Sequence, residues 1–162
     1  MNDFRAGLGW DVHRIERGRP LILGGIEIPS EVGLAGHSDA DVLAHAITDA
    51  ILGAATLGDI GLHFPDTDAR WQGKDSLYFL AHAAHLAREQ GYEILNVDST
   101  VILQRPRLRD FRDAIRGNLA ATLDLPRDRV SVKFKTAEGL GPVGEGQAAE
   151  ARAVALLARG AA

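Results

Sequence analysis

Imidazole and carboxylate groups come close together in two short stretches of the sequence. Asp11 and His13 are two residues apart at the end of a predicted strand, so period-two geometry turns both side chains to one face. His45 lies in a predicted helix, away from its apolar stripe, with Asp41 and Asp49 one turn before and after it. Asp11, His13 and His45 together would form a zinc site with two histidines, one carboxylate and an open fourth position, as in catalytic zinc sites.

An ordinary surface interpretation of these histidines stays open at this point. An imidazole between two carboxylates on a helix is also typical of a solvated face. His37 precedes the predicted helix start, where backbone N–H groups favour an anion, but one histidine is weak support. His82 and His85, three residues apart on another predicted helix, are more typical of a partly exposed helix than of metal ligands.

Other polar segments lie outside these two stretches. The loop from Gly58 to Asp68 is dense in acids, which is also typical of a turn-rich surface loop. At the end of a later predicted strand, alternation places Lys133 and Lys135 on one face and Thr136 and Glu138 on the other. That pattern fits either an exposed strand end or part of a site.

Alternating strands and helices must position these groups. Helices are predicted from Ser38, over 76–90 with Gly91 at its C′ position, over 107–123 and over 147–158. On the first helix, Leu43, Ile47, Ala50, Ile51 and Ala54 recur at helical spacing and should face the core. Strands are predicted over 4–15, 21–28 with a bulge at Gly24-Gly25, 96–104 and 129–134, and loops over 58–74 and 139–146. The pattern predicts an α/β (or α+β-like) fold, with a mixed β-sheet and helices packed on one face.

Length and composition exclude several classes of protein. The 162 residues are most simply one domain over 1–162, and the charged fraction of 25% is that of a globular chain. A net charge of −4 argues against a nucleic-acid partner. With no cysteine, any metal must be held by His and carboxylate groups. The sequence shows neither a membrane-spanning apolar run nor a secretory signal, so we expect a cytoplasmic protein without a membrane partner.

Four motifs in order resemble the 2-C-methyl-D-erythritol 2,4-cyclodiphosphate synthase family of the non-mevalonate isoprenoid pathway. They are G-W-D-V-H (9–13), A-G-H-S-D-A-D-V-L-A-H-A-I-T-D-A (35–50), G-D-I-G-L-H-F-P-D-T-D (58–68) and K-F-K-T-A-E-G-L-G (133–141). Each motif alone is modest evidence for the family, but the resemblance covers nearly the whole chain. It implies a lyase that converts 4-diphosphocytidyl-2-C-methyl-D-erythritol 2-phosphate to the cyclic diphosphate and CMP. It also implies a homotrimer with active sites between subunits.

The resemblance assigns roles to individual residues. It implies that Asp11, His13 and His45 bind Zn²⁺, that Glu138 binds a second ion (Mg²⁺ or Mn²⁺), and that His37, Thr136 and Glu138 are catalytic. Pro106 and its flank, from Leu103 to Leu108, would cradle the cytidine base, supplied by the adjacent subunit along with the segment from Lys135 to Glu138. The implied substrate contacts are Asp11, His13, His37, Ser38, Asp59, Ile60, Gly61, Phe64, Pro65, Asp66, Thr67, Asp68, Leu103, Pro106, Leu108, Lys135, Thr136, Ala137 and Glu138.

The chain also departs from the family pattern. Many members carry an arginine in the loop that here reads Gly141-Pro142-Val143-Gly144-Glu145-Gly146 and is two residues shorter. In the family that arginine lies at the central cavity of the trimer, where isoprenoid diphosphates bind some members. Ala137 stands where a second threonine is common, and Lys135 where a small or hydroxyl residue is usual. Two rival functions remain, a zinc phosphohydrolase and a trimer that binds isoprenoid phosphates without turnover.

Overall fold

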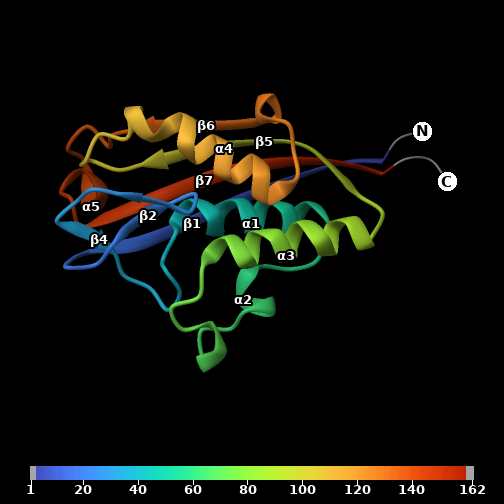
Figure 1. The fold of residues 1–162 in the computed structure, drawn as a ribbon, viewed down its shortest axis with the longest axis horizontal. Helices are drawn as coiled ribbons and strands as arrows, with labels where there is room; N and C mark the ends of the chain where they lie inside the picture. Colours follow the sequence, from blue (N-terminus) through green and yellow to red (C-terminus); the bar gives the residue numbers. More distant parts are fainter. Residues whose placement is uncertain (1–2, 160–162) are drawn as a thin grey trace.

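A five-stranded mixed sheet forms the base of the computed structural model, which describes residues 3–159 (Figure 1). The strand order is β4-β1-β7-β5-β6. β1 (Asp3–Arg17) pairs antiparallel with β7 (Ala148–Arg159) and with the short edge strand β4 (Val32–Leu34). β5 (Glu93–Ile102) pairs antiparallel with β7 and parallel with β6 (Val130–Lys135). Of the expected domain over 1–162, residues 1–2 and 160–162 lie outside the described part.

The helices cover one face of this sheet, in two layers (Figure 1). α1 (Val42–Ala54) packs on the central strands β1 and β7, and α4 (Arg112–Leu123) packs on β6. α3 (Ser76–Glu89) packs over α1 and against α4. This arrangement confirms the predicted mixed sheet with helices on one face. The short elements are β2 (Leu21–Leu23), β3 (Ile26–Ile28), α2 (Ile60–His63), α5 (Gly141–Gly144) and the 3-10 turns η1 (Ala69–Trp71), η2 (Arg109–Phe111) and η3 (Arg127–Arg129).

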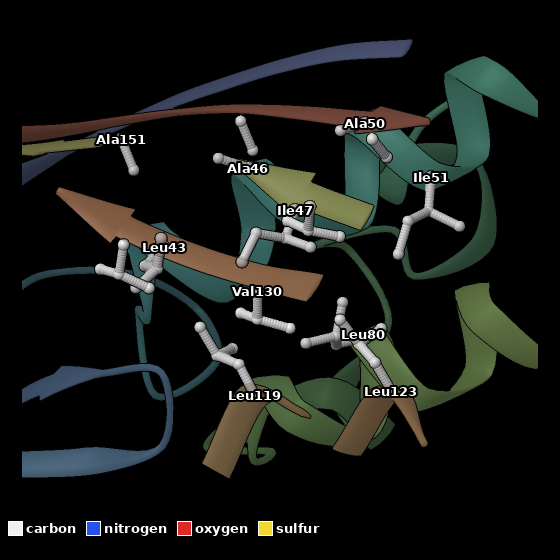
Figure 2. Close-up of a cluster of buried hydrophobic side chains, with 14 of the residues drawn as sticks. Leu43, Ala46, Ile47, Ala50, Ile51, Leu80, Leu119, Leu123, Val130 and Ala151 are labelled. Carbon is white, nitrogen blue, oxygen red and sulfur yellow. The ribbon is translucent and has the colours of Figure 1, made fainter. Parts of the chain in front are cut away.

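The core lies between the sheet and the helices, where aliphatic side chains from α1, α3 and α4 meet (Figure 2). Ile47 and Ile51 of α1, Leu80 of α3, and Leu119 and Leu123 of α4 are all completely buried. The helical spacing predicted this face correctly, since every α1 position expected in the core is buried. The prediction for the second long helix is also confirmed. α3 ends at Glu89, and Gly91 follows with a positive φ of 80°.

The predicted last helix over 147–158 is wrong, because this segment forms β7, the central strand of the sheet. Its Ala, Leu, Arg and Glu residues have high intrinsic helix propensity, but propensity yields to tertiary context. In β7 the small side chains at every second position point to α1, so a helix can lie close to the sheet. These buried positions are Ala149, Ala151, Ala153, Ala155 and Leu157.

The N-terminal region also differs from the prediction at two points. Residues 21–28 form a hairpin rather than one bulged strand, because Gly24 and Gly25 both have positive φ and make its two-residue turn. The first helix does not begin at Ser38. Asp41 is its N-cap, and the carboxylate accepts a hydrogen bond from the backbone N–H of Ala44 at 3.0 Å.

Three segments expected to be uniform contain smaller elements. The predicted loop over 58–74 includes α2 and η1, and the loop over 139–146 includes α5. The helix predicted over 107–123 starts with η2 and becomes α-helical only at Arg112. No helix within residues 3–159 is long and apolar enough to cross a membrane.

Candidate functional site

Asp11, His13 and His45 bring three ligand atoms to one point. Asp11 Oδ2 lies 3.0 Å from His13 Nε2 and 3.0 Å from His45 Nδ1, and the two histidine nitrogens are 3.1 Å apart. A tetrahedral zinc ion with bonds of roughly 2.0–2.1 Å has ligand atoms about 3.3 Å apart. The three atoms therefore fit one such ion with a fourth position left for another ligand. Within residues 3–159 this is the only group of three or more potential ligands that could hold a metal.

Strand and helix geometry explain this convergence. Asp11 and His13 lie on one face of β1 by simple alternation, as predicted. His45 lies in the first turns of α1, and its backbone N–H donates to Asp41 O at 3.0 Å. Gly7 and Gly9 of β1 face α1 and leave no room for a side chain between strand and helix. This close packing brings the three ligand side chains within reach of one another.

The electrostatics of the metal-free triad suit a cation. Burial raises the pKa of Asp11, but hydrogen bonds from His13 and His45 outweigh it and hold the pKa far below its ordinary value. Burial lowers the pKa of His13, yet the hydrogen bond to Asp11 and the charge of Asp11 leave it above its ordinary value. Asp11 is thus ionised and attracts positive charge, whether a proton on His13 or a metal ion.

The second ring nitrogen of His45 has two buried serine partners, of which sequence reasoning identified Ser38 and missed Ser76. His45 Nε2 lies 2.8 Å from Ser76 Oγ and 3.1 Å from Ser38 Oγ. Ser76 in turn donates its hydroxyl proton to Asp39. Ser76 is the first residue of α3, 31 positions from His45, and no local pattern marks it as a neighbour of the triad.

The two carboxylates expected beside His45 have other functions. Asp41 is completely buried and accepts from Gly25 N at 2.7 Å as well as capping α1. Burial raises the pKa of Asp41 to about 6, although these backbone N–H groups favour the ionised form. Asp49 accepts from Ile60 N at 2.7 Å and thereby holds α2. The solvated-face interpretation is therefore wrong for this helix face, which packs into the protein.

A cavity of about 460 Å³ opens beside the triad. Its wall contains His37 and Ser38, both expected substrate contacts. His37 Nε2 lies 3.1 Å from the carbonyl oxygen of Asp68. The remaining lining includes three residues that sequence reasoning did not identify, Gly36, Trp71 and Phe79. The complete lining is His13, Gly36, His37, Ser38, His45, Ile60, Gly61, Phe64, Pro65, Asp66, Trp71 and Phe79.

The acidic loop contributes to this cavity only in part. Its members Ile60, Gly61, Phe64, Pro65 and Asp66 line the wall. Three other expected contacts, Asp59, Thr67 and Asp68, are not in the lining. Asp59 caps α2 by accepting from Leu62 N, and Asp68 caps η1 and pairs with Arg70.

A second, larger cavity of about 990 Å³ contains six further expected substrate contacts. Leu103, Pro106, Leu108, Lys135 and Thr136 line it together with Glu138, whereas Ala137 does not. Four arginines from one short segment also line it, two within the flank 103–108 expected to cradle the base and two beyond it that were not anticipated. These are Arg105, Arg107, Arg109 and Arg112. The two cavities share no lining residue.

Glu138 belongs to the larger cavity and is not part of the triad. Its carboxylate accepts from Thr136 Oγ1 at 2.7 Å, and its backbone N–H donates back to the same hydroxyl at 3.3 Å. Glu138 has a φ of 53°, so this turn is held in the left-handed region. The two expected metal positions, the triad and Glu138, therefore lie in different cavities of one chain.

The remaining histidines of α3 lie outside both cavities. His85 is exposed and pairs with Glu89 at 3.3 Å, one turn along the helix. His82 packs in an aromatic group with Phe64 and Tyr78. Burial lowers the pKa of His82, and the nearby His63 and His85 add to that effect. Neither lines the candidate site, in line with the expectation that they are ordinary helix residues.

Comparison with known proteins matches this arrangement to one family. The model of the YgbB family covers residues 4–158. The 2-C-methyl-D-erythritol 2,4-cyclodiphosphate synthase of Solibacter usitatus is 68% identical over 157 residues, which are 97% of this chain and 99% of that protein.

Solved structures agree with the sequence relatives. A CDP complex of IspF from Plasmodium falciparum superposes with a TM-score of 0.86 at 38% identity, covering 99% of both chains. The bifunctional IspDF of Campylobacter jejuni superposes with a TM-score of 0.95 at 43% identity. There the match covers 99% of this chain and 43% of the longer protein.

Proposed function

The chain belongs to the YgbB family, and we propose from this that it is the enzyme that closes the cyclic diphosphate of the non-mevalonate isoprenoid pathway. It converts 4-diphosphocytidyl-2-C-methyl-D-erythritol 2-phosphate to 2-C-methyl-D-erythritol 2,4-cyclodiphosphate and CMP. The single observation that carries this function is the Asp11–His13–His45 triad, whose two histidines line a cavity, in a chain 68% identical to a named cyclodiphosphate synthase.

The reaction needs alignment and charge neutralisation more than a strong base. An oxygen of the 2-phosphate attacks the β-phosphorus, and CMP leaves. A phosphate monoester has a second pKa near 6, so the attacking oxygen is already ionised at neutral pH. Holding the two phosphates of one substrate in near-attack geometry contributes up to roughly 7–11 kcal/mol.

The triad would hold the ion whose positive charge the substrate phosphates require. Asp11, His13 and His45 would hold Zn²⁺, which when bound acts as a Lewis acid toward a phosphate oxygen. His37 and Ser38 stand on the same cavity wall and orient the phosphate by hydrogen bonds. The erythritol chain occupies the rest of the cavity, against Phe64 and the loop up to Asp66.

The larger cavity receives the cytidine diphosphate half. Leu103, Pro106 and Leu108 supply an apolar surface for the base and ribose. Lys135 and Thr136 contact the phosphates, next to the backbone of Ala137. The Glu138 carboxylate would hold Mg²⁺ or Mn²⁺ against the diphosphate, since hard ions prefer oxygen ligands. CDP complexes of related structures support a cytidine nucleotide as ligand.

Two neighbouring copies complete each site in a homotrimer. The erythritol cavity of one subunit and the nucleotide cavity of the next face one substrate. This explains why the two cavities share no lining residue within a single chain. The uncovered face of the sheet supports self-association, because Leu8 and Trp10 of β1 are 72% and 53% exposed. Phe4, Val12 and Val154 extend this apolar surface. Each copy presents the same surface, as a symmetric assembly requires.

Phosphorus NMR on the purified protein with the cytidine substrate, Zn²⁺ and Mg²⁺ tests the proposed function. We expect a cyclic diphosphate that accumulates in step with CMP. Release of inorganic phosphate would favour the zinc phosphohydrolase instead. Intact substrate in the presence of stoichiometric zinc would favour a trimer that binds isoprenoid phosphates without turnover.

A further inference from the structure

We propose that Ser76 and Asp39 are positioning residues for the metal centre, acting through the ring of His45. Asp39 holds the Ser76 hydroxyl, and the Ser76 hydroxyl holds the proton of the imidazole on the nitrogen that faces away from the metal. This inference rests on the proposed function only in that the triad binds a divalent ion.

The two nitrogens of His45 face different surroundings. Nδ1 lies 3.0 Å from Asp11 Oδ2 and 3.1 Å from His13 Nε2, so it is the atom that belongs to the ligand triangle. Nε2 lies on the opposite edge of the ring, 2.8 Å from Ser76 Oγ. A metal-bound Nδ1 must offer its lone pair, which requires the neutral ring to carry its proton on Nε2.

The single proton of the Ser76 hydroxyl sets the direction of the hydrogen bonds that link His45, Ser76 and Asp39. The hydroxyl has one proton, which it donates to Asp39 Oδ1. Its lone pairs are then left to accept from His45 Nε2–H. An ionised carboxylate has no proton to donate and can only accept hydrogen bonds. Besides the Ser76 hydroxyl, the Asp39 carboxylate accepts from Ser76 N at 3.1 Å and from Asp41 N at 3.2 Å. These contacts orient the carboxylate, and the carboxylate orients the hydroxyl.

Burial makes the contact with Ser76 hard to replace. Ser76 is completely buried, so water does not readily take over the position of its hydroxyl. Ser38 Oγ is the other nearby acceptor, 3.1 Å from His45 Nε2 and 3.3 Å from Ser76 Oγ. Ser38 lines the substrate cavity, whereas Ser76 does not. Ser76 therefore remains a partner of the ring while Ser38 turns to the substrate.

This arrangement predicts a specific loss in metal affinity. A carboxylate–hydroxyl–imidazole chain fixes the tautomer and raises the basicity of the metal-binding nitrogen. Removal of such an outer partner typically weakens metal affinity by about 10–100-fold. A purely structural role, namely tying the start of α3 to the loop at Asp39, would change stability and leave the affinity unchanged.

Zinc and cobalt binding to the metal-free protein test the proposal. The variants are Ser76→Ala and Asp39→Asn, with Ser99→Ala as the matched control. Ser99 is another buried serine, whose hydroxyl donates to the backbone oxygen of Ser131; it lies on β5, which β7 separates from β1 in the sheet. Zinc Kd is measured by competition with a chromogenic chelator, and the visible spectrum of bound Co²⁺ reports the ligand geometry.

We expect Ser76→Ala to weaken zinc binding by about 10–100-fold and to alter the Co²⁺ spectrum, and Ser99→Ala to do neither. Asp39→Asn should shift both readouts in the same direction by a smaller factor, and it decides the question if Ser76→Ala does not fold. Wild-type zinc affinity in folded Ser76→Ala, or in Asp39→Asn where that variant decides, overturns the proposal. Because no substrate is present, these results are independent of whether the wild type forms the cyclic product.

Discussion

Gly9 of β1 lies directly against the backbone of α1 at Ala46, so closely that a Cβ atom on Gly9 would stand 1.8 Å from the Ala46 carbonyl oxygen. Gly7, one pleat earlier, has the same relation to Ala50, at 2.0 Å. The strand that carries Asp11 and the helix that carries His45 are therefore in backbone contact two residues from Asp11, the first candidate metal ligand. This contact sets the separation of the ligands, because neither element can move outward without opening the triad.

The substitution Gly9→Ala should destabilise the protein by about 1–3 kcal/mol or more, since the helix must move away from the sheet. The matched control is Gly53→Ala on α1, where a Cβ meets nothing within 4 Å and helix propensity favours alanine. That control should gain roughly 0.5–1 kcal/mol. Urea unfolding of the metal-free proteins measures both. Equal stabilities for the two variants would contradict the close packing.

The substitution His45→Ala should abolish zinc binding and cyclisation while the fold persists. The hydrogen-bond partners of the ring are polar and Phe79 is its aromatic neighbour, so its loss removes a candidate metal ligand rather than a large apolar contact. Zinc content of the purified variant, product formation by phosphorus NMR and far-UV circular dichroism are the measurements. Full activity in a folded His45→Ala protein would contradict the assignment of the triad.

Zinc should stabilise the protein more as the pH rises above about 6.5. In the metal-free protein the pKa of His13 lies above its ordinary value of 6.5. The contribution of His13 to the free energy of unfolding is therefore complete below pH 6.5, and it is lost as the pH rises through the raised pKa. Zinc binding requires the neutral ring and is favoured over this same interval.

Thermal unfolding with and without zinc at several pH values checks this prediction. We expect the Tm of the metal-free protein to fall above pH 6.5 and the zinc-dependent gain in Tm to grow. His45→Ala is the control, because it cannot complete the triad and should show no such growth. A zinc-dependent gain that does not vary with pH would argue against proton competition at His13.

Mixing two inactive variants should restore activity if each site is shared between copies. His45→Ala removes a residue of the smaller cavity and Glu138→Gln removes one of the larger cavity. In a trimer assembled at random from equal amounts of both, roughly a quarter of the sites receive two intact halves.

The two variants are unfolded and refolded together, and cyclisation is compared with that of each variant refolded alone. Recovery of about one quarter of the wild-type rate is the expected result. The absence of any recovery, with trimers present by light scattering, would show that each chain forms its own complete site.

Local sequence patterns were enough to identify the candidate metal ligands and to predict much of the core. Asp11 and His13 share a face because a strand alternates, and this holds wherever the strand lies in the fold. Leu43 and Ile47 recur at helical spacing, and their burial follows from that spacing. Spacing alone placed His45 with Asp11 and His13 as a possible zinc site but left a solvated face open, and the family resemblance favoured the metal site, with which the geometry of the triad agrees.

Long-range contacts decided the features that the patterns could not predict. Residues 148–159 have helical propensity but form β7, because this segment pairs with β1 on one side and β5 on the other and its small alanines admit α1. Only the alternation of Glu150 and Arg152 with alanine hinted at a strand. The contact of Ser76 with His45 depends on how α3 packs over α1, which no local periodicity encodes. The chemistry of the site was therefore visible in residue types and spacing, whereas the hydrogen bonds that orient its groups arise only when distant segments are packed together.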